Sequence, residues 1–430
     1  MKNKNEIGLK DAIAIGIGGM VGGGIFAVLG LAVELSKGAT PIAFLIAGII
    51  AMLTSYSYVQ LSKTYPSSGG TVDFINQGFG KNIFSGGTNN LLWLSYIIML
   101  SLYASAFGSY GAKMIEITGD YATDKHLLLS AIVIFSTALN YISFKAVSIA
   151  ESIAVFTKMI ILIGFIIIGA YGLTSSDQLF QLKPSNWESP LKIVSGGMVI
   201  FVAYEGFELI ANTIPNLKNY QKNTGKAFYI STGLVVILYI CIAIITVGSV
   251  SFDAIGKAQE YVLAVAAEPV LGKIGFVIIS ITALISTFSA INATLYGGSR
   301  VNYELAEEDE LPHEFTKICW NQPIGLLLTS LLTLTLANTL NLESISTAGS
   351  AGFLWIFALV NLANYRLASK TQSKKFISAL GFSLCLVALA ALFWQQFNSN
   401  RIGVYTVLCI FLTAYLVEWV YKKTEKKKQA

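Results

Sequence analysis

Three consecutive glycines, Gly22 to Gly24, interrupt the first long apolar stretch of the chain, residues 12–32, where an unbroken helix would be expected. Each glycine in a helix interior is unfavourable by about 1 kcal/mol relative to alanine. A helix that opens there exposes bare N–H and C=O groups, and the amino end of the half-helix that follows carries partial positive charge suited to a carboxylate. The stretch therefore predicts an anion-binding break in a helix. The alternative is close helix packing through small residues.

Two carboxylates lie inside another apolar run, residues 190–214, where Glu205 and Glu208 surround Gly206. A charged side chain at the centre of a membrane helix costs at least about 2.5 kcal/mol, so it faces a cavity or a partner group. This run is the second place at which a helix is expected to be interrupted.

A single lysine, Lys158, lies in the apolar run 147–172, about 20 Å from either end at 1.5 Å per residue. Burial disfavours the charged form of a lysine, so a buried lysine can release its proton near neutral pH and serve a proton relay. The alternatives are snorkelling to the membrane surface or a static pair with Glu151. Direct contact with Glu151 is not expected, because seven residues of helix separate the two by about 10 Å along the axis.

Hydroxyl and aromatic side chains add further candidates. Ser286 and Ser289 are one helical turn apart and could present their hydroxyls together, although hydroxyls in membrane helices often bond back to their own helix. A stripe at helical spacing is interpreted mainly as packing, with substrate contact as the alternative; it consists of Trp93, Tyr96, Leu100 and Tyr103.

The composition decides the class of protein in which these groups act. Of the 430 residues, 54% are hydrophobic and only 12% are charged, whereas a soluble protein carries about 25% charged residues. Twelve apolar runs are long enough to cross roughly 30 Å of hydrocarbon. The sequence therefore predicts an all-α polytopic membrane protein with 12 transmembrane helices. We see no cleavable signal peptide, because the first run is too long for one.

Several other classes of protein are disfavoured by the sequence. The net charge of +5 does not indicate nucleic-acid binding, since the basic residues lie between and after apolar runs. Four scattered cysteines and two histidines suggest neither a disulfide framework nor a metal site, and no cofactor is expected. The sequence lacks the GxxxxGK[ST], HExxH and GxSxG motifs, which argues against ATP-driven pumps and hydrolytic enzymes.

The distribution of basic residues predicts the orientation. With both termini on one side, 20 of the 29 Lys and Arg residues fall on that side, 8 on the other, and Lys158 inside a span. The positive-inside rule then places both termini in the cytoplasm of a cell whose inner membrane holds the protein. The acidic segment 303–317 lies on the same side, but acidic residues contribute little to orientation.

The two interrupted runs point to transport. They are five spans apart, so the chain crosses the membrane in opposite directions through them. Corresponding broken helices in two inverted halves are the best sequence indication of a midplane binding site in a secondary transporter. A membrane receptor or structural protein would need neither the paired interruptions nor the buried lysine.

The same residues resemble the amino acid–polyamine–organocation superfamily of transporters. Residues 22–26, GGGIF, are similar to its G-x-G-I-F motif in helix 1, and residues 201–208, FVAYEGFE, to its F-x-A-Y-x-G-F-[DE] motif in helix 6. Leu305 and Ala306, with residues 309–312, DELP, are similar to parts of the L-A-x-D-G-x-L-P motif after helix 8, with Glu310 in place of the usual glycine. The resemblance covers the first ten spans and is greatest to permeases in which a helix-5 lysine, here Lys158, takes the place of a sodium ion.

The resemblance implies the leucine-transporter fold, with broken helices 1 and 6. Residues 11–172 would form the first five-helix repeat, 190–367 its inverted copy, and 376–421 two peripheral helices. The amides of Gly23 and Gly24 would meet the substrate carboxylate, and carbonyls at both breaks its amino group. The implied substrate-binding set is Met20, Gly22, Gly23, Gly24, Ile25, Val202, Ala203 and Glu205. Tyr204 and Phe207 would belong to an aromatic gate.

The resemblance also implies that proton coupling involves Lys158, the carbonyl of Gly18 and the hydroxyl of Ser286 or Ser289. Glu205 departs from the apolar residue of many relatives, and could favour cationic substrates or add a second titrating group. We expect a proton-coupled amino acid permease that works by alternating access, with an amino acid, a proton and the lipid bilayer as its partners. The alternatives are an exchanger and a cationic amino acid or polyamine carrier. The oligomeric state is left open between monomer and homodimer.

Overall fold

The computed structural model describes residues 7–142, 144–307, 310–311, 316–319 and 322–429, with the backbone alone at 142, 144–153, 300, 319 and 425–429. Helices make up almost all of the described chain. The exception is a short antiparallel ribbon, in which β1 (Ile318–Cys319) pairs with β2 (Gln322–Pro323). The prediction of an all-α polytopic membrane protein is confirmed.

Within the described residues, nine helices are long and apolar enough to span a membrane. They are α3 (Thr40–Thr64), α5 (Ile83–Met114), α6 (Tyr121–Ile142), α7 (Phe144–Leu173), α9 (Tyr220–Ser249), α11 (Val262–Glu307), α13 (Leu342–Arg366), α15 (Lys375–Ser399) and α16 (Arg401–Gln429). The shorter helix α12 (Gly325–Thr339) is also apolar.

Two further spans are bent pairs. Helix α1 (Leu9–Met20) meets α2 (Gly24–Ser36) at 47°, and α8 (Pro190–Val199) is followed at 51° by two 3-10 helices, η3 (Phe201–Tyr204) and η4 (Phe207–Asn216). These are the two runs for which the sequence predicts an interruption. Each of the twelve apolar runs coincides with one helix or one bent pair.

Short helices close the two ends of the bundle. They are α4 (Thr71–Phe79), η1 (Leu179–Leu182), η2 (Pro184–Asn186), α10 (Phe252–Lys257) and α14 (Ala368–Thr371). Helix starts follow side-chain caps: Asn82 accepts bonds from the first amides of α5, and Asn341 does so for α13. Helix α11 kinks at Gly272, whose φ is +59°.

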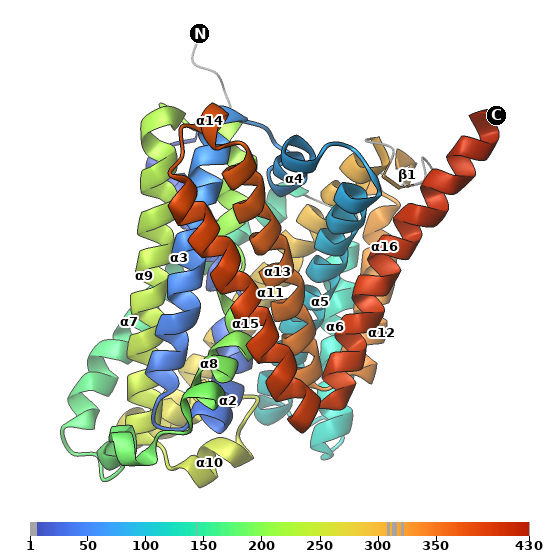
Figure 1. The fold of residues 1–430 in the computed structure, drawn as a ribbon. Helices are drawn as coiled ribbons and strands as arrows, with labels where there is room; N and C mark the ends of the chain where they lie inside the picture. The colour runs from blue at the N-terminus through green and yellow to red at the C-terminus, as the bar shows by residue number, and fades with distance from the viewer. Residues whose placement is uncertain (1–6, 143, 308–309, 312–315, 320–321, 430) are drawn as a thin grey trace.

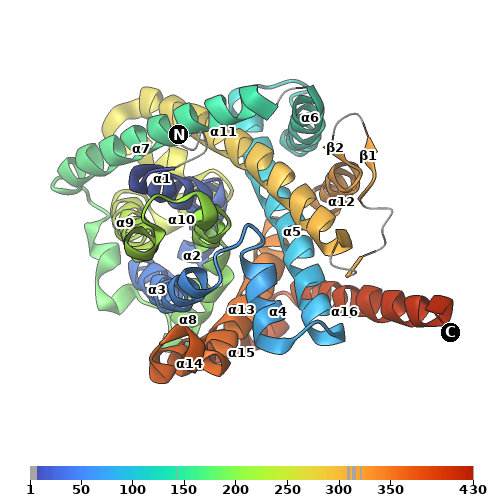
Figure 2. The ribbon, with the colours of Figure 1, turned by 90° about the horizontal axis from the view of Figure 1, so that it is seen from above.

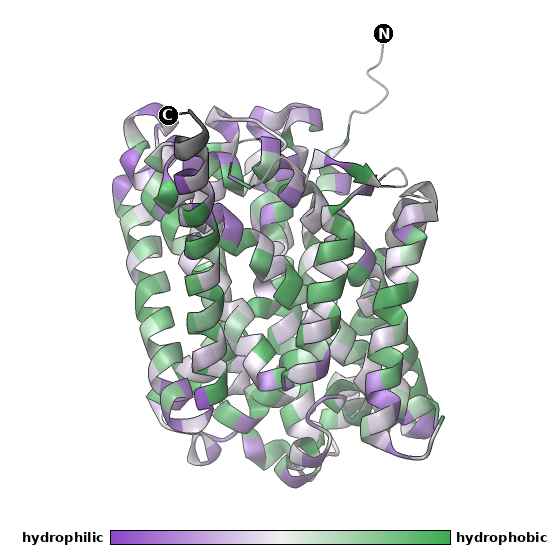
Figure 3. Ribbon diagram, turned by 90° about the vertical axis from the view of Figure 1, so that its right-hand side faces the viewer, coloured by the Kyte–Doolittle hydropathy of each residue, from purple (hydrophilic) through white to green (hydrophobic). Residues whose placement is uncertain are grey.

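The two broken spans lie inside the bundle. Seen from above, α1 and α2 are surrounded by α3, α5, α9 and α11 (Figure 2). The most hydrophobic windows of α5 and α13 are 89% buried, against 28% for those of α6, α15 and the described parts of α7 and α16. Apolar residues dominate the middle of the bundle and polar residues its ends, as expected in a bilayer (Figure 3).

Helix α16 ends at the same end of the bundle at which the described chain begins, near α4, α14 and β1 (Figure 1). Helix α10 and the turn after α7 lie at the opposite end (Figure 1). The division into repeats 11–172 and 190–367 with a peripheral pair 376–421 stays a prediction.

Candidate functional site

The first break lies between Met20 and Gly24. The last amide bonds of α1 run from Val21 to the carbonyl of Ile17, at 2.8 Å, and from Gly22 to that of Gly19, at 3.2 Å. Helix α2 then begins at Gly24, with buried residues on all sides. The first amides of a helix have no acceptor within it, and they carry its positive dipole end. The amino end of α2 therefore places amides without an acceptor in their own helix in the centre of the protein, as the predicted anion site requires.

The second break follows a different backbone course. After the 3-10 turn η3, Glu205 is extended, with φ −62° and ψ 147°, and Gly206 has φ +114°. That φ lies in the left-handed region, where glycine is favoured because it has no Cβ. The break thus depends on Gly206, which the sequence places between the two carboxylates.

The two breaks touch each other backbone to backbone. A Cβ added to Gly206 would lie 2.4 Å from the carbonyl carbon of Gly19, and one added to Gly24 would lie 2.8 Å from the Cα of Ala203. The glycines therefore serve close packing as well as the opening of the helix. The packing alternative and the anion-site prediction are both compatible with this arrangement.

A tyrosine that the sequence did not single out joins the two breaks. The hydroxyl of Tyr239, on α9, lies 2.7 Å from the carbonyl oxygen of Met20 and 3.1 Å from that of Ala203, and donates to them. The side chain is fully buried. Nothing in the sequence around Tyr239 distinguishes it from other aromatic residues of an apolar helix, so only the tertiary structure could identify it.

Lys158 points from α7 to the first broken helix. Its Nζ donates to the carbonyl oxygen of Gly18 at 3.1 Å, and the side chain is 1% exposed. The backbone of Gly18 lies against α7, since an added Cβ there would come within 2.9 Å of Val155. The ammonium is thus directed at α1 and does not snorkel to the surface. The side chain of Glu151 lies outside the described residues.

Ser286, on α11, contacts the same unwound segment. Its hydroxyl lies 3.0 Å from the carbonyl oxygen of Val21, and it also contacts that of Gly22. Ser289 is buried on the same helix. Lys158 and Ser286, from two different helices, therefore contact three carbonyls at the end of α1 and in the break, those of residues 18, 21 and 22.

The two residues assigned to an aromatic gate lie in separate clusters. The hydroxyl of Tyr204 donates to the carbonyl of Phe44 at 2.8 Å, and its ring packs against Tyr239. Phe207 packs against Tyr58 and Phe357, with ring centroids 5.5 and 5.1 Å apart. The role of the pair as one gate stays a prediction.

Glu205 is buried, and its carboxylate accepts a hydrogen bond from the hydroxyl of Tyr103 at 3.3 Å. The ring of Tyr103 also covers the first break, because a Cβ on Gly23 would lie 2.4 Å from its Cδ1. Tyr103 belongs to the stripe on α5 that was interpreted mainly as packing. The structure brings it to both breaks.

Helix α13 holds the second break from the other side. The hydroxyls of Ser346 and Ser350 donate to the carbonyl of Val199 at 2.6 and 2.9 Å, and the amide of Val202 lies 2.9 Å from the Ser350 oxygen. These two serines were also missed by sequence reasoning, since serines on an apolar helix commonly bond to their own backbone.

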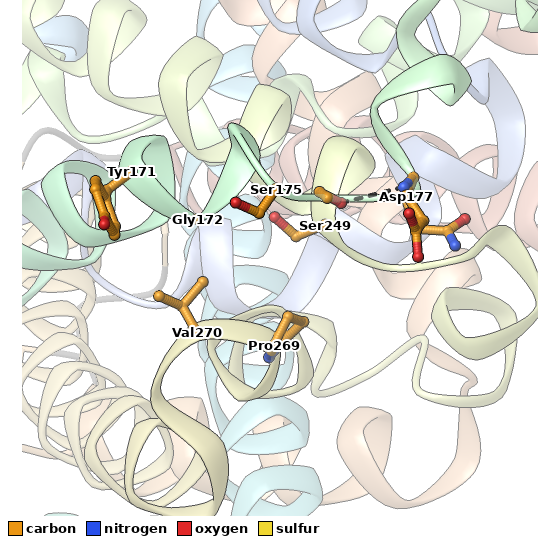
Figure 4. A pocket seen from close by; sticks show the side chains of 9 residues that line it. Tyr171, Gly172, Ser175, Asp177, Ser249, Pro269 and Val270 are labelled. Atoms are coloured by element: carbon orange, nitrogen blue, oxygen red, sulfur yellow. Dashed lines mark hydrogen bonds between the residues drawn. The ribbon is translucent and has the colours of Figure 1, made fainter.

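The structure is closed around the predicted substrate site. All of the implied contact residues are buried: Met20, Gly22, Gly23, Gly24, Ile25, Val202, Ala203 and Glu205. Two cavities lie elsewhere, at the end of the bundle that holds α10. One, of about 420 Å³, is lined by Tyr171, Ser175, Asp177, Ser249 and Pro269 among others (Figure 4). The other, of about 310 Å³, lies beside Lys113 and Glu260.

Comparison with known proteins identifies the family. The model of the family described as amino acid permease matches residues 7–417. The chain is 35% identical to an uncharacterized protein of Methanocaldococcus jannaschii, over 99% of this chain and 97% of that one. It is 31% identical to the inner membrane transport protein YbaT of Escherichia coli, over 97% of each. It is 22% identical to the branched-chain amino acid permease BcaP of Bacillus subtilis, over 91% of this chain and 89% of that one.

Fold and matches together define a multi-pass membrane transporter, which is not an enzyme. The chain belongs to the amino acid permease family of the amino acid–polyamine–organocation superfamily. The resemblance found in the helix-1 and helix-6 motifs is thereby confirmed.

Proposed function

We propose that this permease is a proton-coupled amino acid symporter of the inner membrane, with both termini in the cytoplasm. The observation that carries the proposal is the bond from the Lys158 ammonium to the carbonyl of Gly18, which lies two residues before the end of α1. A buried cation that holds a broken helix can do the work of a bound ion. Unlike a bound ion, it can be neutralised by loss of a proton.

In the proposed mechanism, protonated Lys158 holds α7 against the carbonyl of Gly18 in the last turn of α1, and the hydroxyl of Ser286 holds the carbonyl of Val21 just beyond it. Loss of the proton to the cytoplasm removes a charge-assisted hydrogen bond and loosens the inner side of the bundle. Reprotonation from the outside restores the bond. Occupancy of the charged state then couples the conformational change to the proton gradient.

Substrate recognition is assigned to backbone groups at the two breaks. The amides of Gly23 and Gly24 at the start of α2 bind the carboxylate, and the carbonyls of Met20 and Ala203 bind the amino group. In the closed structure those two carbonyls accept from Tyr239. Each carbonyl has two lone pairs, so it can keep this bond and accept another. Recognition by backbone groups fits a site that binds the carboxylate and amino groups common to all amino acids.

Two other modes of transport compete with this proposal. In an exchanger, Lys158 is a static counter-charge and substrates cross only against other amino acids. In a cationic amino acid or polyamine carrier, the buried carboxylate of Glu205 selects the substrate charge. Each predicts a different response to an imposed proton gradient or to charged competitors.

The test is uptake of labelled amino acids into proteoliposomes, with and without an inward proton gradient. The panel includes leucine, isoleucine and valine, because a branched-chain permease is among the relatives, together with alanine and lysine. The parent should concentrate substrate only with the gradient, whereas Lys158→Ala should bind substrate but ignore the gradient. A Lys158→Ala protein that still accumulates amino acid in response to the gradient would refute the role of Lys158 in proton coupling. If unlabelled amino acid inside the liposomes, without a proton gradient, supports as much uptake as the gradient does, the result would favour exchange.

A further inference from the structure

Two acidic side chains share the centre of this protein. Glu205 and Glu208 are 4% and 1% exposed, and their carboxyl groups interact electrostatically with each other. Glu208 accepts from the amide of Gly206 at 2.7 Å, while its second oxygen is buried without a partner. Among the described residues, neither carboxyl forms an ion pair with Lys or Arg.

In the part of the chain that the structure describes, the titratable groups found to interact electrostatically with Glu205 are acids. They are Glu208 on η4, Tyr96 and Tyr103 on α5, Tyr58 on α3 and Tyr239 on α9. The basic group of the site, Lys158, donates to the carbonyl of Gly18. An unpaired buried carboxylate costs several kcal/mol, and two adjacent ones repel each other at short range. In the stable state, therefore, Glu205 and Glu208 do not both carry a negative charge.

Tyr103 connects this pair to the predicted carboxylate site. Its hydroxyl holds Glu205 at 3.3 Å, and the same hydroxyl would lie 3.5 Å from a Cβ on Gly22. A substrate carboxylate that reaches the amides of Gly23 and Gly24 arrives beside this ring. If Glu205 is ionised, two carboxylates then approach each other in a buried, low-dielectric site. If Glu205 is protonated, this repulsion disappears and its carboxyl O–H can donate a hydrogen bond.

We propose that Glu205, paired with Glu208, is a second proton-binding site, and that a neutral amino acid binds only when Glu205 is protonated. The proposal rests on the proposed function of the breaks as the amino acid site, and it adds a proton carrier distinct from Lys158. The two groups have separate tasks. Protonation of Lys158 controls the conformational change through the position of α1, so without Lys158 the gradient does not drive uptake, whereas protonation of Glu205 controls only the affinity for the substrate.

The test is equilibrium binding of tritiated leucine, alanine and lysine to purified protein in nanodiscs, from mildly acidic to mildly alkaline pH. Because one proton is taken up with the substrate, parent affinity for leucine or alanine should fall about tenfold per pH unit at the alkaline end. Glu205→Gln, which keeps the size and the neutral charge, should bind tightly with no pH dependence. The matched control Glu188→Gln, at a surface position, should behave like the parent.

Two further variants separate the roles. Tyr103→Phe keeps the ring over Gly23 but removes the donor that stabilises ionised Glu205, so the fall in affinity should move to higher pH. Lys158→Ala should keep the parental pH dependence of binding. A Glu205→Gln protein with the same slope as the parent would overturn the proposal. So would a Glu205→Gln protein whose only change is a lost preference for lysine, since Glu205 would then select cations.

The proposed function can fail separately. Parent protein that binds no amino acid of the panel at any pH would refute the assignment of the breaks as an amino acid site. Parent protein that binds leucine or alanine with the same affinity at every pH would keep that assignment and refute only the role of Glu205. Thermal unfolding of each variant beside the parent verifies that a lost signal does not come from a misfolded protein.

Discussion

Gly206 of the second broken helix lies directly on the backbone of Gly19 in the first, so close that a Cβ at Gly206 would come within 2.4 Å of the Gly19 carbonyl carbon. The contact joins the two broken spans at the level where each loses its helical bonds. Any change of separation between the spans must alter it. We therefore expect this contact to determine both the stability of the closed state and the geometry of the proposed substrate site.

Gly206→Ala should be among the most damaging single substitutions in the chain. The added Cβ meets backbone, and φ +114° is unfavourable for any residue with a side chain. Strain and overpacking each cost on the order of 1–3 kcal/mol. We expect a lower apparent Tm and loss of binding. The control is Gly297→Ala on α11, where a Cβ meets nothing within 4 Å; equal effects of the two would contradict the argument.

Gly24→Val should abolish amino acid binding. Its side chain would meet Ala203, whose Cα lies 2.8 Å from the Cβ position, and would obstruct the approach of a carboxylate to the α2 amides. Gly233→Val on α9 is the matched control, since no atom lies within 4 Å of that position. Binding is measured by thermal shift with saturating amino acid. Unchanged affinity in Gly24→Val would mean that the glycine serves only helix packing.

Tyr239→Phe should destabilise the closed, substrate-free state. The change removes the donor shared by the carbonyls of Met20 and Ala203, and a buried acceptor left unsatisfied costs about 1–3 kcal/mol. An amino acid that donates to the same carbonyls should recover part of the loss, so ligand should raise the Tm of the variant more than that of the parent. Tyr229→Phe, at a partly exposed position of α9, provides the control. Equal ligand shifts in parent and Tyr239→Phe would argue against amino-group binding at these carbonyls.

Glu260 ties the loop before α11 to two other helices. Its carboxylate accepts from Lys125 at 2.5 Å and from the hydroxyls of Ser109 and Tyr121 at 2.9 Å. Burial raises the pKa of Glu260, but the Lys125 ammonium and the hydrogen bonds outweigh it, so its pKa lies below the ordinary value. A depressed pKa means that the contribution to stability is present at neutral pH and is lost as the pH falls through the folded-state pKa.

Glu260→Gln should therefore lower the Tm at neutral pH, by the equivalent of about 1–3 kcal/mol. The difference between parent and variant should shrink at acidic pH, below the ordinary range of a glutamate. Asp253→Asn is the control, because its ion pair with Lys257 is largely exposed and contributes little. A difference that stays constant down to acidic pH would exclude the ion pair as its source.

Much of this protein follows from local sequence. Apolar runs predict the spans, because a membrane helix must be apolar over its whole length. Interruptions in such runs are equally visible, since three glycines or two carboxylates contradict the pattern of their neighbours. The first bend, between Met20 and Gly24, falls at the glycines. In the second span the bend lies between Val199 and Phe201, and the left-handed turn lies at Gly206 between the two carboxylates. Lys158 could be singled out for the same reason: a lone charge in an apolar run has no local explanation.

Only the tertiary structure decided which groups meet. Tyr239, Ser346 and Ser350 are ordinary residues of helices, and nothing in their own segments distinguishes them. Tyr103 belongs to a stripe whose spacing favours packing, and the stripe alone does not show that this tyrosine contacts both breaks. They contact the breaks because α5, α9 and α13 pass beside the two unwound segments, and that packing depends on the whole bundle. Likewise, Tyr204 and Phe207 are three residues apart, but the backbone turn at Gly206 sends them into different clusters. A local pattern records what one segment requires, whereas contacts between distant helices arise only when all of them pack.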